Sequence, residues 1–191
     1  MRKLTITTFL TLDGVMQAPG GPEEDLTGGF AHGGWSMPFW DEGMGEIMAK
    51  ALAAPFDLLL GRKTYQVFAG HWPTATGEPG ADELNAARKY VASRTLTRVE
   101  WNNSMLISGD VAGTVADLKR QPGPEIQVHG SGDLAQTLLR RDLVDEINAW
   151  IFPIVLGKGK RLFGAGTMPT TFTLREVVPS STGVLIATYT R

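Results

Sequence analysis

Short apolar runs alternate along this chain with segments whose apolar residues recur at helical spacing, and this alternation predicts the order of the elements. Runs of β-branched and other apolar residues between turn formers predict strands. They fall at Lys3–Leu10, Asp57–Leu60, Lys89–Ala92, Ser104–Ile107, Glu125–His129 and Glu146–Val155. Helices are predicted at Asp41–Ala54, Lys63–Ala69, Asp82–Ala87, Thr114–Arg120 and Asp133–Arg140. Strands that alternate with helices indicate an α/β fold with a mostly parallel central sheet, flanked by helices on both faces.

Two segments depart from this pattern. Phe172–Val178 and Val184–Thr190 flank a Pro-Ser-Ser-Thr-Gly stretch, which predicts a C-terminal antiparallel hairpin at one edge of the sheet. Residues 18–38 are rich in glycine and proline and predict no regular element. A loop of this length in a compact domain is usually a functional lid or disordered, and we expect a Gly-rich lid insert here.

Length and charge limit the classes of partner. The chain has 191 residues and an ordinary apolar fraction, which fits one domain over 1–191. The net charge is −2 and the charged residues are interspersed, so no basic stripe indicates nucleic-acid binding. No apolar run approaches the roughly 20 residues of a membrane span, and Met1–Leu10 has the pattern of a strand rather than of an export signal. We therefore expect a cytoplasmic protein with neither nucleic acid nor membrane as partner.

The absence of cysteine narrows the chemistry. Disulfides, thiolate nucleophiles and Cys-based metal sites are excluded, so redox chemistry would need a bound cofactor. No pair among His32, His71 and His129 has metal-ligand spacing, and no metal is predicted.

Three predicted strand ends carry residues suited to phosphate. The first strand end runs into Gly61, Arg62, Lys63 and Thr64 at the start of a helix. A helix N-terminus presents free backbone N–H groups to an anion, and the two cations add charge-assisted contacts. The alternative is that Gly61 makes a tight turn and that the cations are merely solvated.

The other two strand ends are similar. Ser93 and Arg94 follow a strand and could share a phosphate monoester, although an exposed loop is the alternative. The third turn has glycines that allow a close approach of pyrophosphate, or it is an ordinary turn between strand and helix. Its residues are Gly130, Ser131, Gly132, Asp133 and Leu134. Because ligands of open α/β sheets bind at the carboxyl ends of the strands, the combination favours a dinucleotide site.

Five motifs in order carry a family resemblance. They are Thr11-Leu12-Asp13-Gly14, Leu58 to Tyr65, Val91 to Thr95, Val128 to Leu134 and Ile154 to Phe163. Together they resemble the reductase domain of the bifunctional riboflavin-biosynthesis deaminase/reductase, which is similar in fold to dihydrofolate reductase. The resemblance implies NADPH bound on the three turns and on Gly14, with Asp13 near the nicotinamide, and it implies a homodimer. The partner deaminase needs a zinc-binding His/Cys motif, which a chain without cysteine cannot supply.

Candidates for the substrate side are fewer. Asp41 is the one acid on its predicted helix that shares the apolar arc, so it is either a catalytic carboxylate of the dihydrofolate-reductase kind or an N-cap. Trp40 could stack on a heterocycle or cover a core edge. Lys158 and Arg161 could bind a ribose phosphate or lie in a solvated turn.

The expected function is NADPH-dependent reduction of a small heterocyclic substrate. The leading candidate is a reductase of the 5-amino-6-(5-phosphoribosylamino)uracil type. Dihydrofolate or another pterin is the alternative substrate. A nucleotide-binding protein with little catalytic activity is the alternative of another class.

Overall fold

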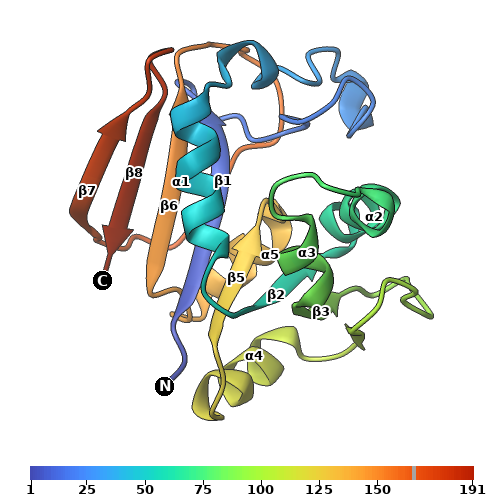
Figure 1. Ribbon diagram of the computed structural model, residues 1–191. Coiled ribbons are helices and arrows are strands. Elements are labelled where there is room, and N and C mark those ends of the chain that lie inside the picture. Colours follow the sequence, from blue (N-terminus) through green and yellow to red (C-terminus); the bar gives the residue numbers. More distant parts are fainter. Residues whose placement is uncertain (165–166) are drawn as a thin grey trace.

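The computed structural model describes residues 1–164 and 167–191, and its centre is one mixed sheet of eight strands. The strands lie in the order β4-β3-β2-β5-β1-β6-β8-β7 (Figure 1). Their bounds are Leu4–Thr11 (β1), Phe56–Gly61 (β2), Arg88–Ala92 (β3), Ser104–Ile107 (β4), Glu125–His129 (β5), Glu146–Phe152 (β6), Thr173–Pro179 (β7) and Leu185–Thr190 (β8). Strands β1 to β6 pair in parallel, while β8 is antiparallel to β6 and to β7. The prediction of a mostly parallel sheet with a C-terminal hairpin is confirmed.

One strand is shorter than predicted. β6 ends at Phe152 instead of Val155, because Pro153 has no N–H to donate to a ladder. The chain turns there, and the Ile154 N–H donates to the Phe152 carbonyl at 2.8 Å.

Helices cover both faces of the sheet, as predicted. They are α1 (Glu42–Leu52), α2 (Arg62–His71), α3 (Ala81–Ala86), α4 (Val111–Arg120) and α5 (Gly132–Arg140), with short 3-10 turns at Thr27–Gly29, Met37–Phe39 and Trp72–Thr74. Helices α4 and α5 pack on one face and α1 to α3 on the other. Within 1–164 and 167–191, no helix has the length and apolar content needed to cross a membrane.

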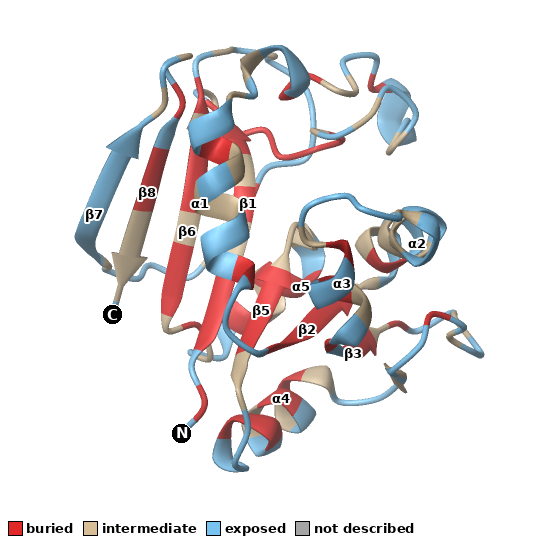
Figure 2. Ribbon diagram, in the orientation of Figure 1, coloured by how far each residue is buried: buried red, intermediate tan, exposed pale blue. Residues whose placement is uncertain are grey.

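The apolar core differs between the two faces. On the α4–α5 face, one continuous cluster joins the centres of β1 and β5 to both helices; it includes Ile6, Val128 and Leu138. The α1 face carries two clusters, one around Phe152 and the other around Leu60. The burial colouring of Figure 2 shows the buried strands that carry both faces. Helix α1 bridges the two clusters, with Met44 in one and Leu52 in the other.

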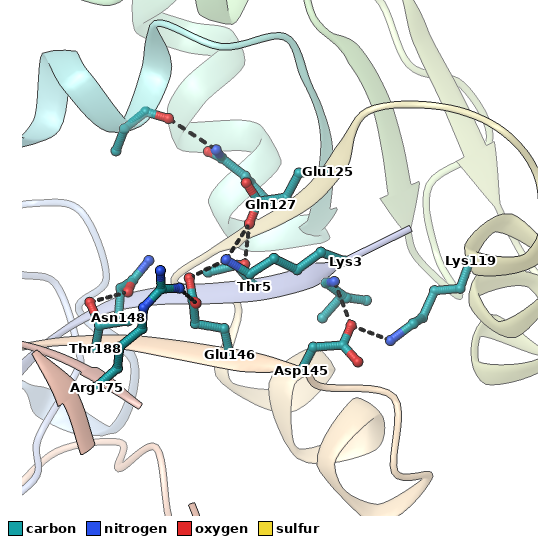
Figure 3. Close-up of polar contacts among 12 residues, drawn as sticks. Lys3, Thr5, Lys119, Glu125, Gln127, Asp145, Glu146, Asn148, Arg175 and Thr188 are labelled. Carbon is teal, nitrogen blue, oxygen red and sulfur yellow. Dashed lines mark hydrogen bonds and ion pairs between the residues drawn. The ribbon is translucent and has the colours of Figure 1, made fainter. Parts of the chain in front are cut away.

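Polar side chains occupy the α1 face toward the amino ends of the central strands (Figure 3). Lys3 Nζ lies 2.6 Å from Glu146 Oε1 and 3.7 Å from Glu125 Oε1. Arg175 of β7 lies 3.8 Å from Glu146 Oε2. Negative and positive side chains therefore alternate from β5 to β7, in the order Glu125, Lys3, Glu146 and Arg175, and we call this set the charge row. Glu146 is only 5% exposed, and its charge is compensated by the two cations on either side.

The insert predicted as a lid is a loop closed by hydrogen bonds to Gln17, the residue that precedes it. The side-chain amide of Gln17 donates to the carbonyls of Asp25 (3.0 Å) and Thr27 (2.9 Å), and the Trp35 indole donates to the Gln17 carbonyl (2.7 Å). A Cβ on Gly33 would lie 2.5 Å from the Gly21 carbonyl oxygen, so only glycine fits where the two ends of the loop meet.

Candidate functional site

The three predicted phosphate turns lie side by side. β3, β2 and β5 are neighbours, and all three run in the same direction, so their carboxyl ends share one edge of the sheet. The Gly61 N–H donates to Ser131 Oγ at 2.9 Å, and the Ser131 N–H donates to Thr64 Oγ1 at 3.1 Å. The structure thus joins the turns after β2 and β5 by hydrogen bonds, although they lie about 70 residues apart in the sequence.

The turn after β5 is a concave backbone segment. Gly130 has φ +51° and Ser131 has φ 53° and ψ 48°, so two successive residues are left-handed. A Cβ on Gly132 would lie 2.9 Å from Met16 Sδ. Helices α5 and α2 begin at these turns, and their first N–H groups have no acceptor within the helix. Successive N–H groups at two helix N-termini can bind an anion such as a diphosphate.

The cations of the site are free to bind an anion. Arg62, Lys63 and Arg94 are exposed, and none of them is paired with a carboxylate of the described residues. Ser93 Oγ accepts from the N–H groups of Thr95 (3.2 Å) and Leu96 (3.0 Å), which leaves its own proton for a phosphate oxygen.

The remaining predicted cofactor residues differ in what they can offer. The side chain of Leu134 is buried in the core, so only its backbone N–H can take part. Asp133 is exposed in the first turn of α5, where its own backbone N–H can face an anion. Gly14 has φ +79° in the turn after β1, the strand next to β5. These positions extend the site from the α5 N-terminus toward β1.

Asp13 is bound within its own loop. Its carboxylate accepts from Thr11 Oγ1 (2.6 Å), from the N–H groups of Leu156 (3.2 Å) and Gly157 (2.8 Å), and from Arg161 (3.3 Å). The Thr11 hydroxyl, followed by those two N–H groups, lowers the pKa of Asp13 to about 2. A carboxylate that holds so many donors stays ionised at neutral pH, and this geometry favours a loop-fixing role over proton donation.

Of the two alternatives for Asp41, the structure shows the N-cap. Its Oδ1 accepts from the Met44 N–H at 2.8 Å, and its Oδ2 accepts from the N–H (2.9 Å) and Oγ (2.6 Å) of Ser181 in the β7–β8 turn. The Ser181 hydroxyl is the main reason why the pKa of Asp41 is lowered. Helix α1 therefore begins at Glu42, one residue later than predicted, and both carboxylate oxygens are occupied.

The other predicted substrate residues lie on the far side of β1. Trp40 stacks on Trp150 at 5.9 Å between ring centroids, with 11° between the planes, so it covers a core edge. Arg161 is engaged with Asp13 and with the Gly157 carbonyl. Lys158 is exposed at the rim of a hollow between the insert and the loop after β6. Gln17, Thr27, Gly28, Gly29, Phe30, Ala31, His32, Gly159 and Lys160 line the rest of that hollow.

His129 is a site residue that the sequence reasoning passed over. It is the last residue of β5 and directly precedes Gly130. Its Nε2 lies 3.1 Å from Gln127 Oε1, and its ring centroid lies 6.1 Å from that of Phe68 on α2. Desolvation lowers its pKa to about 4, so the imidazole is neutral at physiological pH. The available signal was its position, because a polar residue that ends a central strand before a glycine turn faces the ligand edge.

Comparisons with known proteins agree with this architecture. A family model described as "RibD C-terminal domain" matches residues 2–186. A curated relative, the uncharacterized protein YyaP of Bacillus subtilis (strain 168), is 28% identical over 166 residues, which cover 85% of this chain and 80% of that protein.

Solved structures show the same fold at low sequence identity. A putative riboflavin biosynthesis protein from Shewanella sp. PV-4 has a TM-score of 0.74 at 20% identity, with 99% of this chain and 98% of that chain covered. A pyrimidine reductase-like protein from Corynebacterium diphtheriae has a TM-score of 0.65 at 11% identity, with 99% and 91% covered. The third is a diaminohydroxyphosphoribosylaminopyrimidine deaminase/5-amino-6-(5-phosphoribosylamino)uracil reductase from Thermotoga maritima. It has a TM-score of 0.64 at 14% identity, and the match covers 99% of this chain but 56% of that chain.

Proposed function

This chain belongs to the RibD C-terminal domain family, and from this premise we propose that it is an NADPH-dependent reductase of a small heterocyclic substrate. One observation carries the proposal: three phosphate-compatible turns lie at the adjacent carboxyl ends of β5, β2 and β3, and hydrogen bonds join two of them.

The three turns are suited to different phosphate groups of the cofactor. The N–H groups at the starts of α5 and α2 would hold the diphosphate, and Arg62 and Lys63 would add positive charge there. Ser93 and Arg94 are suited to a phosphate monoester at the outer end, which is the group that distinguishes NADPH from NADH. NADPH supplies a hydride to an electrophilic carbon. The protein contributes by holding the two reactants in contact and by excluding water from them.

A C=O or C=N bond of a heterocyclic or ribosyl-linked compound is the proposed acceptor. A compound of the 5-amino-6-(5-phosphoribosylamino)uracil type leads, because the name of the Thermotoga maritima neighbour includes that reductase activity. The pterin alternative needs a free carboxylate on the inward side at the start of α1, and the candidate for it, Asp41, is already engaged with Met44 and Ser181.

Calorimetric titration of the purified protein with NADPH and with NADH tests the proposal. We expect NADPH to bind more tightly than NADH, and this preference to shrink in Arg94→Ala and Arg62→Ala variants. Arg140→Ala is the matched control, because Arg140 is also exposed but lies at the opposite end of α5. Binding of neither dinucleotide would refute the reductase proposal. Tight NADPH binding without reduction of any heterocycle tested would favour a nucleotide-binding protein instead.

We also propose a homodimer, on the resemblance to the family. Strand β7 is exposed along its whole length, and Leu174, Val177 and Leu185 share one apolar face of the hairpin. Light scattering after size exclusion is expected to give a dimer mass, which Val177→Lys reduces to a monomer mass. Glu176→Lys is the control, because Glu176 points to the opposite face. A monomeric wild-type protein would contradict the proposal.

A further inference from the structure

The α1 face of the sheet has a polar gap next to the cofactor turns. Its two apolar clusters lie around Phe152 of β6 and Leu60 of β2. Strand β5, which lies between β1 and β2, brings Gln127 and His129 to this face instead of apolar side chains. His129 is the residue of the pair at the carboxyl end, and the turn that follows it is the proposed diphosphate turn.

A relay of hydrogen bonds sets the tautomer of His129. The Ala51 carbonyl at the end of α1 can only accept, so the Gln127 side chain must direct its Nε2 toward it, at 3.2 Å. Gln127 Oε1 then faces His129 Nε2 at 3.1 Å, and an amide oxygen can only accept as well. The proton of the neutral ring is therefore on Nε2, and Nδ1 carries a lone pair.

Among the described residues, this lone pair has no donor, and His129 as a whole is partly exposed. His129 Nδ1 makes no hydrogen bond to any described residue. His129 is partly exposed and ends β5 at the edge where the cofactor turns lie, so a ligand bound at this edge can approach its ring.

We infer that His129 Nδ1 is the acceptor that orients the substrate ring, through a hydrogen bond from a ring or exocyclic N–H group of the substrate. The inference rests on the proposed function and names the substrate class more narrowly, as an uncharged heterocycle with an N–H donor on the edge that faces β5. Asp13 and Asp41 cannot fill this role, because their carboxylates are already satisfied by neighbouring donors. The low pKa of His129 keeps the acceptor available at neutral pH.

The first test is the tautomer itself. In protein labelled with ¹⁵N-histidine, long-range ¹H–¹⁵N correlations at pH 7 report which ring nitrogen is protonated. The chain has three histidines, so a His129→Asn variant assigns the signal. We expect a neutral ring with its proton on Nε2. A proton on Nδ1, or a charged ring, would overturn the inference without reference to any ligand.

The second test uses two matched probes with the NADPH-loaded protein. 2,4-Diaminopyrimidine offers N–H donors, and 2,4-dimethoxypyrimidine has the same ring without them. We expect the diamino probe to bind with a roughly tenfold lower Kd, and its addition to shift the Nδ1 resonance. Equal binding of the two probes, or no binding of the diamino probe, would overturn the inference.

A pair of variants separates the two ring nitrogens. Asparagine places its amide near the position of Nδ1, whereas glutamine reaches the position of Nε2. His129→Gln is expected to weaken binding of the diamino probe roughly three- to tenfold, and His129→Asn by less than about twofold. NADPH affinity should be unchanged in both. Failure of the wild-type protein to bind NADPH would refute the proposed function. If NADPH binds normally and His129→Gln binds the diamino probe as tightly as the wild type does, this inference alone is refuted.

Discussion

Ser131 provides the sharpest test of how the cofactor turns are built. Its hydroxyl accepts from the Gly61 N–H at 2.9 Å and donates to the His129 carbonyl at 2.8 Å, while its backbone is left-handed with φ 53°. Ser131→Ala removes both hydrogen bonds and keeps the backbone strain. Ser131→Gly removes the same bonds but relieves the strain, since glycine adopts this conformation without a Cβ clash.

The magnitudes follow from these contacts. Two hydrogen bonds at about 1 kcal/mol each give a loss of about 2 kcal/mol in the free energy of unfolding for Ser131→Ala. Relief of the left-handed strain returns about 1 kcal/mol, so Ser131→Gly should lose only about half as much. In both variants the turns after β2 and β5 are no longer joined through this hydroxyl, and we expect the Kd for NADPH to rise roughly three- to tenfold.

Urea denaturation and calorimetry measure the two effects separately. Equal unfolding free energies for Ser131→Ala and Ser131→Gly would refute the assignment of backbone strain at this position. An NADPH Kd in Ser131→Ala equal to that of the wild type would show that the hydroxyl does not organise the cofactor site. Arg140→Ala again serves as the control for non-specific effects.

Three further predictions concern the rest of the molecule. Lys89 is fully buried, and desolvation lowers its pKa from 10.5 to about 8, so the folded state disfavours its charged form. The free energy of unfolding of the wild type should therefore rise between pH 8 and 10.5, by up to about 3 kcal/mol relative to that of Lys89→Met. Urea titrations measure this difference, and parallel pH profiles of the two proteins would contradict the prediction. Asp41→Ala should lower the Tm more than Asp41→Asn, because Asn still caps a helix. The affinity for NADPH should be unchanged in both variants, and a lower affinity would place Asp41 in the cofactor site. Gly33→Ala should speed proteolysis within residues 18–38, whereas Gly21→Ala, whose Cβ meets no atom within 4 Å, should not.

The fold was largely predictable, because burial and periodicity act locally. The short apolar run Leu58–Leu60 before a glycine predicts a buried strand, and the cations that follow the glycine indicate a helix start; both elements are present. Every predicted strand and helix is present within a few residues of its predicted bounds. Among the strands, β6 differs most in length, because the effect of Pro153 outweighed the apolar residues that follow it.

The site was less predictable, because its carboxylates accept hydrogen bonds from residues that are distant in the sequence. Asp41 accepts a hydrogen bond from Ser181, and Asp13 accepts hydrogen bonds from Leu156 and Gly157. No local sequence pattern predicts such contacts. The sequence left both interpretations of Asp41 open for that reason. The backbone turns were easier to find, since glycine and helix-start signals are local.

The register of β1 has a consequence for how the protein is made. Leu4 pairs with Ile126 and Thr5 with Glu146, so the first strand synthesised lies in the middle of the finished sheet. Both of its neighbours leave the ribosome only after most of the chain. Until then an apolar strand has two unpaired edges, and the pairing that completes the sheet must close very long loops. Folding of this domain is therefore expected to be completed only after its synthesis is nearly finished, with the exposed first strand as the segment that a chaperone would protect.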